Sequence, residues 1–237
     1  MSYSDVSRQT IIYAIVILSC SVGAHFGYSA LYPQRVLLSK AENQLSIGKT
    51  AEASELCRQA ADFGSKNIQF MFSFCDIAFR LNDDSLLDRC MDGLTDLNAR
   101  LNTSSELTRA AGLFENAGRP EQAIMLLSAH SERVNKSPDL TFYLAELYKR
   151  TKRYYKAKTL YQQLLSDSSL GNRALFELAE MYSWQGELKK AEQLLLQLLT
   201  ADDENRDARI ILARVLTGQK RFEEAIEQYK KALKIKQ

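Results

Sequence analysis

The stretch KRFEEAIEQYKKALKI, residues 220–235, indicates the kind of fold that the whole chain adopts. Small Ala225 is followed four residues later by bulky Tyr229, a spacing that places both on one side of an α-helix. Most of the remaining positions carry Glu, Gln or Lys. The stretch therefore predicts an amphipathic helix with a small residue at the point where a neighbouring helix can approach closely.

The same pattern recurs upstream at a constant interval. Each earlier copy of the small residue lies 34 residues before the next, at Ala191, Ala157 and Ala123. A second motif with a Leu–Ala pair precedes three of these copies, as LAELY (144–148), LAEMY (178–182) and LARVL (212–216). A bulky residue follows each copy by four positions, at Leu127, Tyr161, Leu195 and Tyr229. A fixed period of this length predicts a stack of repeated helix pairs.

This pattern resembles the tetratricopeptide-repeat (TPR) family over four units in one register, residues 104–237. Two degenerate units, residues 34–103, keep mainly the small residues of the pattern, and the family's early tryptophan is missing throughout. Gly118 and Gly186 fall at the turns between helices in two units. The resemblance implies an all-α fold, a right-handed superhelical solenoid of about six helix pairs, in which each pair buries its apolar face against the next.

An apolar segment precedes the repeats. Residues 11–32 contain no Asp, Glu, Lys or Arg, and about 20 apolar residues suffice to span a bilayer as a helix. We expect an uncleaved transmembrane helix, or signal anchor, after a short tail at residues 1–10. Two alternatives stay open: signal-peptidase cleavage at the small residues Ser21–Ala24, and lipidation of Cys20 in a sequence similar to a lipobox.

A stripe of small residues runs along this predicted transmembrane helix. Ser19, Gly23 and Gly27 recur every four residues, which lets another helix approach that side closely. The stripe predicts packing against a transmembrane partner or against a second copy of the chain.

Composition and motifs argue against catalysis and against nucleic-acid binding. The 31 Lys and Arg nearly balance the 29 Asp and Glu, so no general positive field would attract nucleic acid. The two histidines, His25 and His130, are not accompanied by a triad, and no glycine-rich phosphate-binding motif occurs. We therefore expect no enzyme activity, no cofactor and no metal site.

The four cysteines show no metal-binding spacing. Cys20 lies in the apolar segment, which leaves Cys57, Cys75 and Cys90 in the repeats. We expect these three to be free thiols at small core positions. A Cys57–Cys75 bridge is the alternative if the repeats face an oxidising compartment.

The resemblance further implies a groove lined by the first helix of each pair, where a protein partner binds. The implied groove residues are Phe142, Glu146, Lys149, Arg150, Arg173, Phe176, Glu180, Trp184, Ile210 and Arg214. The family's carboxylate clamp for chaperone tails does not carry over, because apolar residues stand at the matching positions and the clamp asparagines are absent. A competing surface is the basic C-terminal end, with Lys230 and Lys231 beside Tyr229 and Leu233.

The expected function is that of a membrane-anchored TPR scaffold that helps to assemble a membrane or envelope complex, in secretion, polysaccharide export, pilus formation or cofactor maturation. The alternatives are an accessory subunit that docks through its transmembrane helix and a secreted or lipid-anchored periplasmic TPR protein. The expected location is a bacterial inner membrane, crossed once. A short N-terminal tail favours a periplasmic repeat domain, whereas free thiols would favour the cytoplasm.

Overall fold

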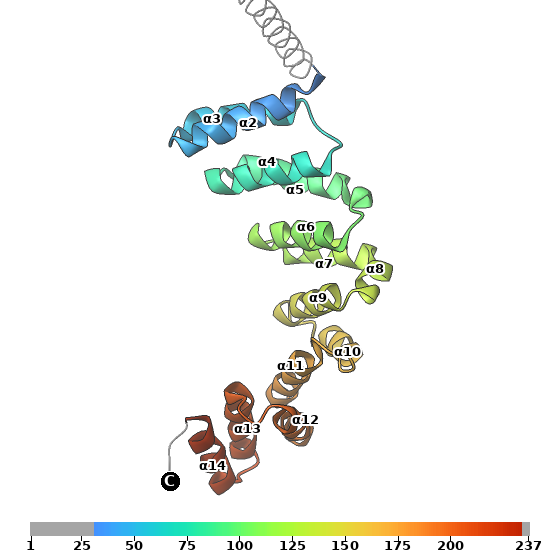
Figure 1. The fold of residues 1–237 in the computed structure, drawn as a ribbon, viewed down its shortest axis with the longest axis vertical. Coiled ribbons are helices and arrows are strands. Elements are labelled where there is room, and N and C mark those ends of the chain that lie inside the picture. The colour runs from blue at the N-terminus through green and yellow to red at the C-terminus, as the bar shows by residue number, and fades with distance from the viewer. Residues whose placement is uncertain (1–30, 234–237) are drawn as a thin grey trace, which may run out of the picture. The chain divides into compact units, whose positions relative to one another are not determined.

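The computed structural model describes residues 31–233. This part of the chain consists of thirteen α-helices, α2 to α14, and one 3-10 helix, η1, and contains no strand. Successive helices form antiparallel pairs (Figure 1). The all-α, TPR-like solenoid predicted from the period is thus confirmed. The chain divides after Asn102 into two compact units, and each is described by itself.

The N-terminal unit contains two helix pairs. Its elements are α2 (Pro33–Ser46), α3 (Thr50–Asp62), α4 (Ile68–Leu81), α5 (Asp84–Asp96) and η1 (Asn98–Arg100). Asp83 caps α5 by accepting a hydrogen bond from the backbone of Leu86. The same carboxylate accepts hydrogen bonds from Ser54 (2.7 Å) and Arg58 (2.6 Å) of α3, which links the two pairs.

The C-terminal unit contains four pairs and one additional short helix. Its elements are α6 (Ser104–Asn116), α7 (Pro120–Ala129), α8 (Ser131–Lys136), α9 (Pro138–Arg150), α10 (Tyr154–Gln163), α11 (Gly171–Trp184), α12 (Leu188–Ala201), α13 (Arg206–Gly218) and α14 (Phe222–Ala232). Helix α8 lies between the first and second pairs and was not expected from the period. Partly buried His130 joins α7 to α8.

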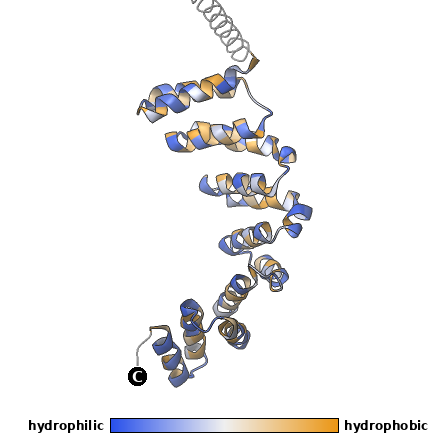
Figure 2. Ribbon diagram, viewed as in Figure 1, coloured by the Kyte–Doolittle hydropathy of each residue, from blue (hydrophilic) through white to orange (hydrophobic). Residues whose placement is uncertain are grey.

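Small residues lie where the helices of a pair cross. Ala179 of α11 and Ala191 of α12 are both fully buried and belong to one apolar cluster, which α13 completes with Ile211, Leu212 and Val215. Hydrophobic and hydrophilic segments alternate along the longer helices (Figure 2). Each helix therefore buries one stripe and exposes the other, as an amphipathic helix in a stack must.

The turn within each pair contains one residue in the left-handed conformation. These residues are Gly48, Asn82, Gly118, Lys152, Gly186 and Lys220, with φ between 52° and 80°. Within the C-terminal unit they are spaced 34 residues apart, which confirms the repeat register independently of the core. Glycine adopts this conformation without steric cost, whereas lysine does so at a cost that the rest of the turn must offset.

The expectation of free thiols is wrong for two of the three described cysteines. Cys75 of α4 and Cys90 of α5 form a disulfide, with their Cα atoms 5.3 Å apart. The alternative bridge from Cys57 to Cys75 is not formed either, since Cys57 is a buried free thiol. The reason is that Cys75 and Cys90 face each other across one helix pair. Burial, together with the negative charge of Asp83, raises the pKa of the Cys57 thiol to about 11.

Most of the predicted transmembrane segment lies outside the described residues, as does the whole stripe of Ser19, Gly23 and Gly27. Within residues 31–233, none of the helices combines the length and the apolar character that a membrane span requires. Helix α2 begins at Pro33, a residue that favours the first position of a helix.

The close crossing of α11 and α12 can be tested by adding bulk. Ala191→Leu should lower the free energy of unfolding by about 1–3 kcal/mol, because a fully buried alanine leaves no room for an isobutyl group. Ala201→Leu, the same change at an exposed position of α12, is the matched control and should leave stability nearly unchanged. Chemical denaturation of both variants measures the difference, and equal stabilities would contradict the register.

The disulfide should stabilise the N-terminal unit. Its two cysteines are 15 residues apart, and closing a loop of that length in the unfolded chain stabilises the fold by about 3 kcal/mol. Cys75→Ala/Cys90→Ala should therefore melt at a lower temperature than the wild type, and reductant should lower the melting temperature of the wild type and of Cys57→Ala but not that of the double variant. Cys57→Ala is the control that leaves the bridge intact. A reductant-insensitive wild type would contradict the bridge.

Candidate functional site

The groove residues implied by the family resemblance all lie on the first helices of the last three pairs. Phe142, Glu146, Lys149 and Arg150 are on α9; Arg173, Phe176, Glu180 and Trp184 are on α11; Ile210 and Arg214 are on α13. These ten residues are called the first-helix face below. Their side chains differ widely in exposure and in the number of hydrogen bonds and ion pairs that they form with neighbouring groups.

A polar network connects α9 to α11 within this face. Lys149 forms an ion pair with Glu177 of α11 and a second one, at 3.2 Å, with Glu146 of its own helix. Glu146 in turn accepts a hydrogen bond from the hydroxyl of Tyr161 on α10. Only 15% of the Lys149 side chain is exposed. Three helices are therefore joined around one largely covered ammonium group.

Burial and charge both shift the proton affinities of this network. Burial disfavours the charged form of Lys149, but its bonds with Glu177 and Glu146 outweigh that effect and raise its pKa. Burial raises the pKa of Glu177, and the ion pair with Lys149 only partly opposes this. The Tyr161 pKa is raised by burial and by its hydrogen bond to Glu146, so this tyrosine stays a donor. The network therefore joins α9, α10 and α11 through charged and hydrogen-bonded side chains.

Glu115 of α6 links the preceding pair in the same way. It forms an ion pair with Arg150 and accepts a hydrogen bond of 2.5 Å from the hydroxyl of Tyr143, both on α9. Burial, followed by this contact with Glu115, raises the pKa of Tyr143. Arg150 is thus already neutralised by a carboxylate of its own chain, although half of its side chain remains exposed.

The aromatic residue Phe142 is covered rather than open. It packs edge-on against Tyr161, with ring centroids 5.5 Å apart, and the Arg173 guanidinium lies 4.4 Å from the centroid of its ring. Stacking of this kind is favourable because the ring face carries negative charge density. Phe142 therefore contributes to the core of the face, while Arg173 is exposed above it.

Three residues of the face remain accessible for binding: Trp184, Arg173 and Arg214. Trp184 is half exposed at the end of α11 and lies outside the core. Arg214 is exposed on α13 and makes no ion pair within residues 31–233. Phe176 and Ile210 are partly buried. The accessible part of the face thus combines one large aromatic surface with cationic groups.

Sequence reasoning missed the partners that hold this face together. Tyr143 contacts Glu115 and Glu177 contacts Lys149, and both pairs are separated by 28 residues. The sequence contains a signal for these contacts, because Tyr143 and Glu177 are one period apart, as are Glu115 and Lys149. One period further on, the equivalent positions carry Ser183 and Ile211, which cannot form an ion pair. This series of polar links between first helices therefore stops at α11, the helix that ends at Trp184.

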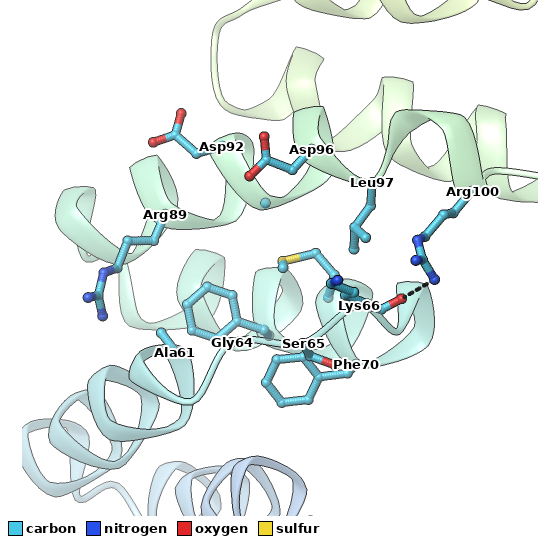
Figure 3. Close-up of a pocket in the computed structure, with 13 residues that line it drawn as sticks. Ala61, Gly64, Ser65, Lys66, Phe70, Arg89, Asp92, Asp96, Leu97 and Arg100 are labelled. Carbon is cyan, nitrogen blue, oxygen red and sulfur yellow. Dashed lines mark hydrogen bonds between the residues drawn. The ribbon is translucent and has the colours of Figure 1, made fainter.

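A second candidate surface, not expected from the sequence, lies in the N-terminal unit. A pocket of about 510 Å³ opens between α5, the start of α4 and the segment after α3 (Figure 3). Buried Phe70, Met71 and Phe74 line its apolar part. A Cβ atom at Gly93 would lie 2.3 Å from Cε of Met71, so a larger residue there would require the flexible Met71 side chain to move.

Charged groups surround the opening of this pocket. Arg89 and Arg100 lie at opposite ends and are engaged, Arg89 with Asp62 at 2.7 Å and Arg100 with the backbone oxygen of Lys66 at 3.3 Å. Asp92 and Asp96 are exposed on α5 and make no ion pair among the described residues. The pocket can receive an apolar group. The structure offers no group of three or more metal-ligating side chains there or elsewhere in residues 31–233.

The comparisons with known proteins agree with the repeat pattern. Residues 142–205 and 185–237 match two family models, both described as tetratricopeptide repeat. Together with the helix pairs, these matches show that the chain carries tetratricopeptide repeats. No curated protein matches the chain.

Solved structures resemble this fold at low sequence identity. MamA is 19% identical, with a TM-score of 0.55 over 65% of this chain and 90% of that one. The C-terminal part of a TPR repeat-containing protein from Cytophaga hutchinsonii is 15% identical, with a TM-score of 0.59 over 83% and 78%. YrrB, described as a TPR protein with an unusual peptide-binding site, is 15% identical, with a TM-score of 0.54 over 76% and 92%. At these identities the likeness shows the fold alone.

The Lys149 network makes a prediction about pH. Lys149→Met leaves the largely covered carboxylates of Glu146 and Glu177 without their cation, which raises the pKa of Glu177 further. A carboxyl with a raised pKa in the folded state stabilises the fold only while protonated, so stability falls as pH rises through that pKa. The variant should lose about 1–3 kcal/mol near neutral pH and much less near the ordinary carboxyl pKa.

Urea denaturation at both pH values measures this effect. Lys189→Met removes an exposed lysine that forms no ion pair within residues 31–233, and it should match the wild type at either pH. A loss for Lys149→Met that is independent of pH would contradict the electrostatic explanation.

Proposed function

We propose that this chain is a non-enzymatic TPR scaffold that binds a segment of a partner protein on its first-helix face. The observation that carries this proposal is the position of Trp184. The chain's single tryptophan is half exposed at the point where the polar links between first helices end. The exposed half of this side chain is not used in packing the repeats, and tryptophan and arginine dominate the binding energy of protein interfaces.

The accessible residues indicate the charge and the apolar character that a partner segment should have. Arg173 is exposed on α11, the helix that ends at Trp184, and Arg214 is exposed on α13, the next first helix, where it forms no ion pair within residues 31–233. A helical or extended segment with an apolar anchor beside acidic residues would fit this surface. The likeness to YrrB supports a peptide as ligand, since that protein is described as having a peptide-binding site.

The N-terminal segment supports a location at a membrane. An apolar, uncharged stretch at residues 11–32 would anchor the scaffold, and the stripe of Ser19, Gly23 and Gly27 would give it a second contact with a membrane complex. The Cys75–Cys90 disulfide supports a repeat domain on the oxidising side, which is the periplasm if the membrane is a bacterial inner membrane. Assembly of an envelope complex is the role we propose.

A second candidate function rests on the stripe of small residues alone. If docking occurs through the transmembrane helix, Gly23→Leu/Gly27→Leu should weaken the association and changes on the first-helix face should not. The two candidate functions therefore differ in whether the N-terminal segment or the first-helix face binds the partner.

The proposal predicts that Trp184→Ala weakens partner binding at least about tenfold while the fold stays intact. Tagged full-length protein is recovered from detergent-solubilised membranes, bound proteins are identified by mass spectrometry, and affinity is then measured with the purified partner. Tyr155→Ala removes an aromatic side chain that is 82% exposed on second helix α10, and it serves as the matched control. Equal binding by Trp184→Ala, Tyr155→Ala and the wild type would refute the face as the site.

A further inference from the structure

The last helix carries an apolar stripe that no described element covers. Phe222, Ile226 and Leu233 are each 53–54% exposed, and partly buried Tyr229 lies between them. Their spacing of four, three and four residues places all of them on one side of α14. Continuous exposure of large apolar groups along a helix side marks an interaction surface rather than ordinary scatter.

Comparison with the preceding pairs shows what this side of a second helix does elsewhere. One period before the stripe, α12 carries Leu188, Glu192, Leu195 and Leu199, and α13 is packed against this side. There Glu192 accepts hydrogen bonds from Gln219 (2.8 Å) and Arg221 (2.6 Å) of the following turn. In α10 the equivalent Lys158 bonds Gln185 at 3.0 Å in the same way.

The stripe of α14 departs from this arrangement at one position. Ile226 stands where α10 has Lys158 and α12 has Glu192. In α7 the equivalent residue, Ile124, is only 4% exposed, and α8 and α9 are packed against α7. An isoleucine at this position is therefore covered where a counterpart is present, and in α14 no described element covers it.

Two unpaired charges of opposite sign flank the stripe. Glu223 and Lys230 are both exposed, and neither forms an ion pair within residues 31–233. They are seven residues apart, so they lie on the same edge of α14, one near each end. The other charges of the helix are already paired, Glu224 with Arg221 at 2.6 Å and Glu227 with Lys231 at 2.7 Å.

We propose that this stripe, Phe222–Ile226–Tyr229–Leu233 with flanking Glu223 and Lys230, is the interface of a homodimer in which two copies of α14 pack antiparallel. The arrangement is self-complementary. An antiparallel pair centred between Ile226 and Tyr229 brings Phe222 against Leu233 and Ile226 against Tyr229, twice over. The same two-fold axis brings Glu223 of one protomer near Lys230 of its partner, because equivalent edges of antiparallel helices meet. Each apolar residue of the stripe thereby contacts an apolar residue of the partner, and each flanking charge lies near an opposite charge.

The size of the surface sets the expected strength. One helix of three turns offers a smaller patch than the roughly 800 Å² per partner of a standard interface. The dimer should therefore dissociate in the micromolar range or weaker, and the charge pairs at its edge should strongly affect its specificity.

Charge reversal tests the antiparallel geometry directly. Glu223→Lys places lysine opposite lysine in the homodimer, and Lys230→Glu places glutamate opposite glutamate, so each variant alone should raise the dimer dissociation constant at least about tenfold. Mixing the two variants recreates both opposite-charge pairs, because Lys at 223 in one chain meets Glu at 230 in the other. The mixture, and the double variant Glu223→Lys/Lys230→Glu by itself, should return to wild-type affinity.

Sedimentation equilibrium of the full-length protein in detergent, from low to high micromolar concentration, provides the readout. Lys189→Glu, a charge reversal at the equivalent position of α12, is the control and should not alter association. Helical circular dichroism confirms that each variant is folded. Dimerisation through the N-terminal segment would leave all variants associating alike and would overturn the proposal. So would a monomeric wild type, which would indicate another occupant of the stripe, or a mixture that fails to recover.

Discussion

The structure depends on the close crossing of two helices at small residues. In the last four pairs, the alanines on the period, from Ala123 to Ala225, are almost completely buried, and partners such as Ala145 and Ala179 are equally so. Because methyl side chains let the helix axes approach, the larger residues one turn away can fill the gap to the next pair. A single left-handed residue then reverses the chain, and the cycle begins again. One pair cannot bury its apolar surface alone, so the stack is stable only as a whole.

Polar contacts between consecutive pairs add a second, more local constraint. The links from α6 to α9 and from α9 to α11 use different residues, Glu115 with Tyr143 and Lys149 with Glu177, at the same separation along the chain. They neutralise most of the charges that a ligand could otherwise use. Binding on the first-helix face must therefore rely on the few groups that the repeats leave unsatisfied, and Trp184 and Arg214 are the most accessible of these.

Equivalent positions in a repeat protein need not have equivalent roles. Tyr161, Leu195 and Tyr229 occupy one position of the pattern, yet the first two are fully buried and the third is only partly so. Lys158 and Glu192 bond the following turn, whereas Ile226 is left exposed. The burial of a given repeat position therefore depends on whether a neighbouring helix pair is packed against it.

The sequence by itself determined the helix pairs, their period and the turn positions at Gly118 and Gly186. These follow from spacing along one helix, since a residue's side of the helix is fixed by 3.6 residues per turn. Only the tertiary structure decided which side chains meet between helices: the bridge from Cys75 to Cys90, the bonds of Glu115, Glu146 and Glu177, and the pocket above Phe70. Such contacts depend on the axial offset and rotation of one helix against another, which packing of the whole stack fixes and periodicity leaves undefined.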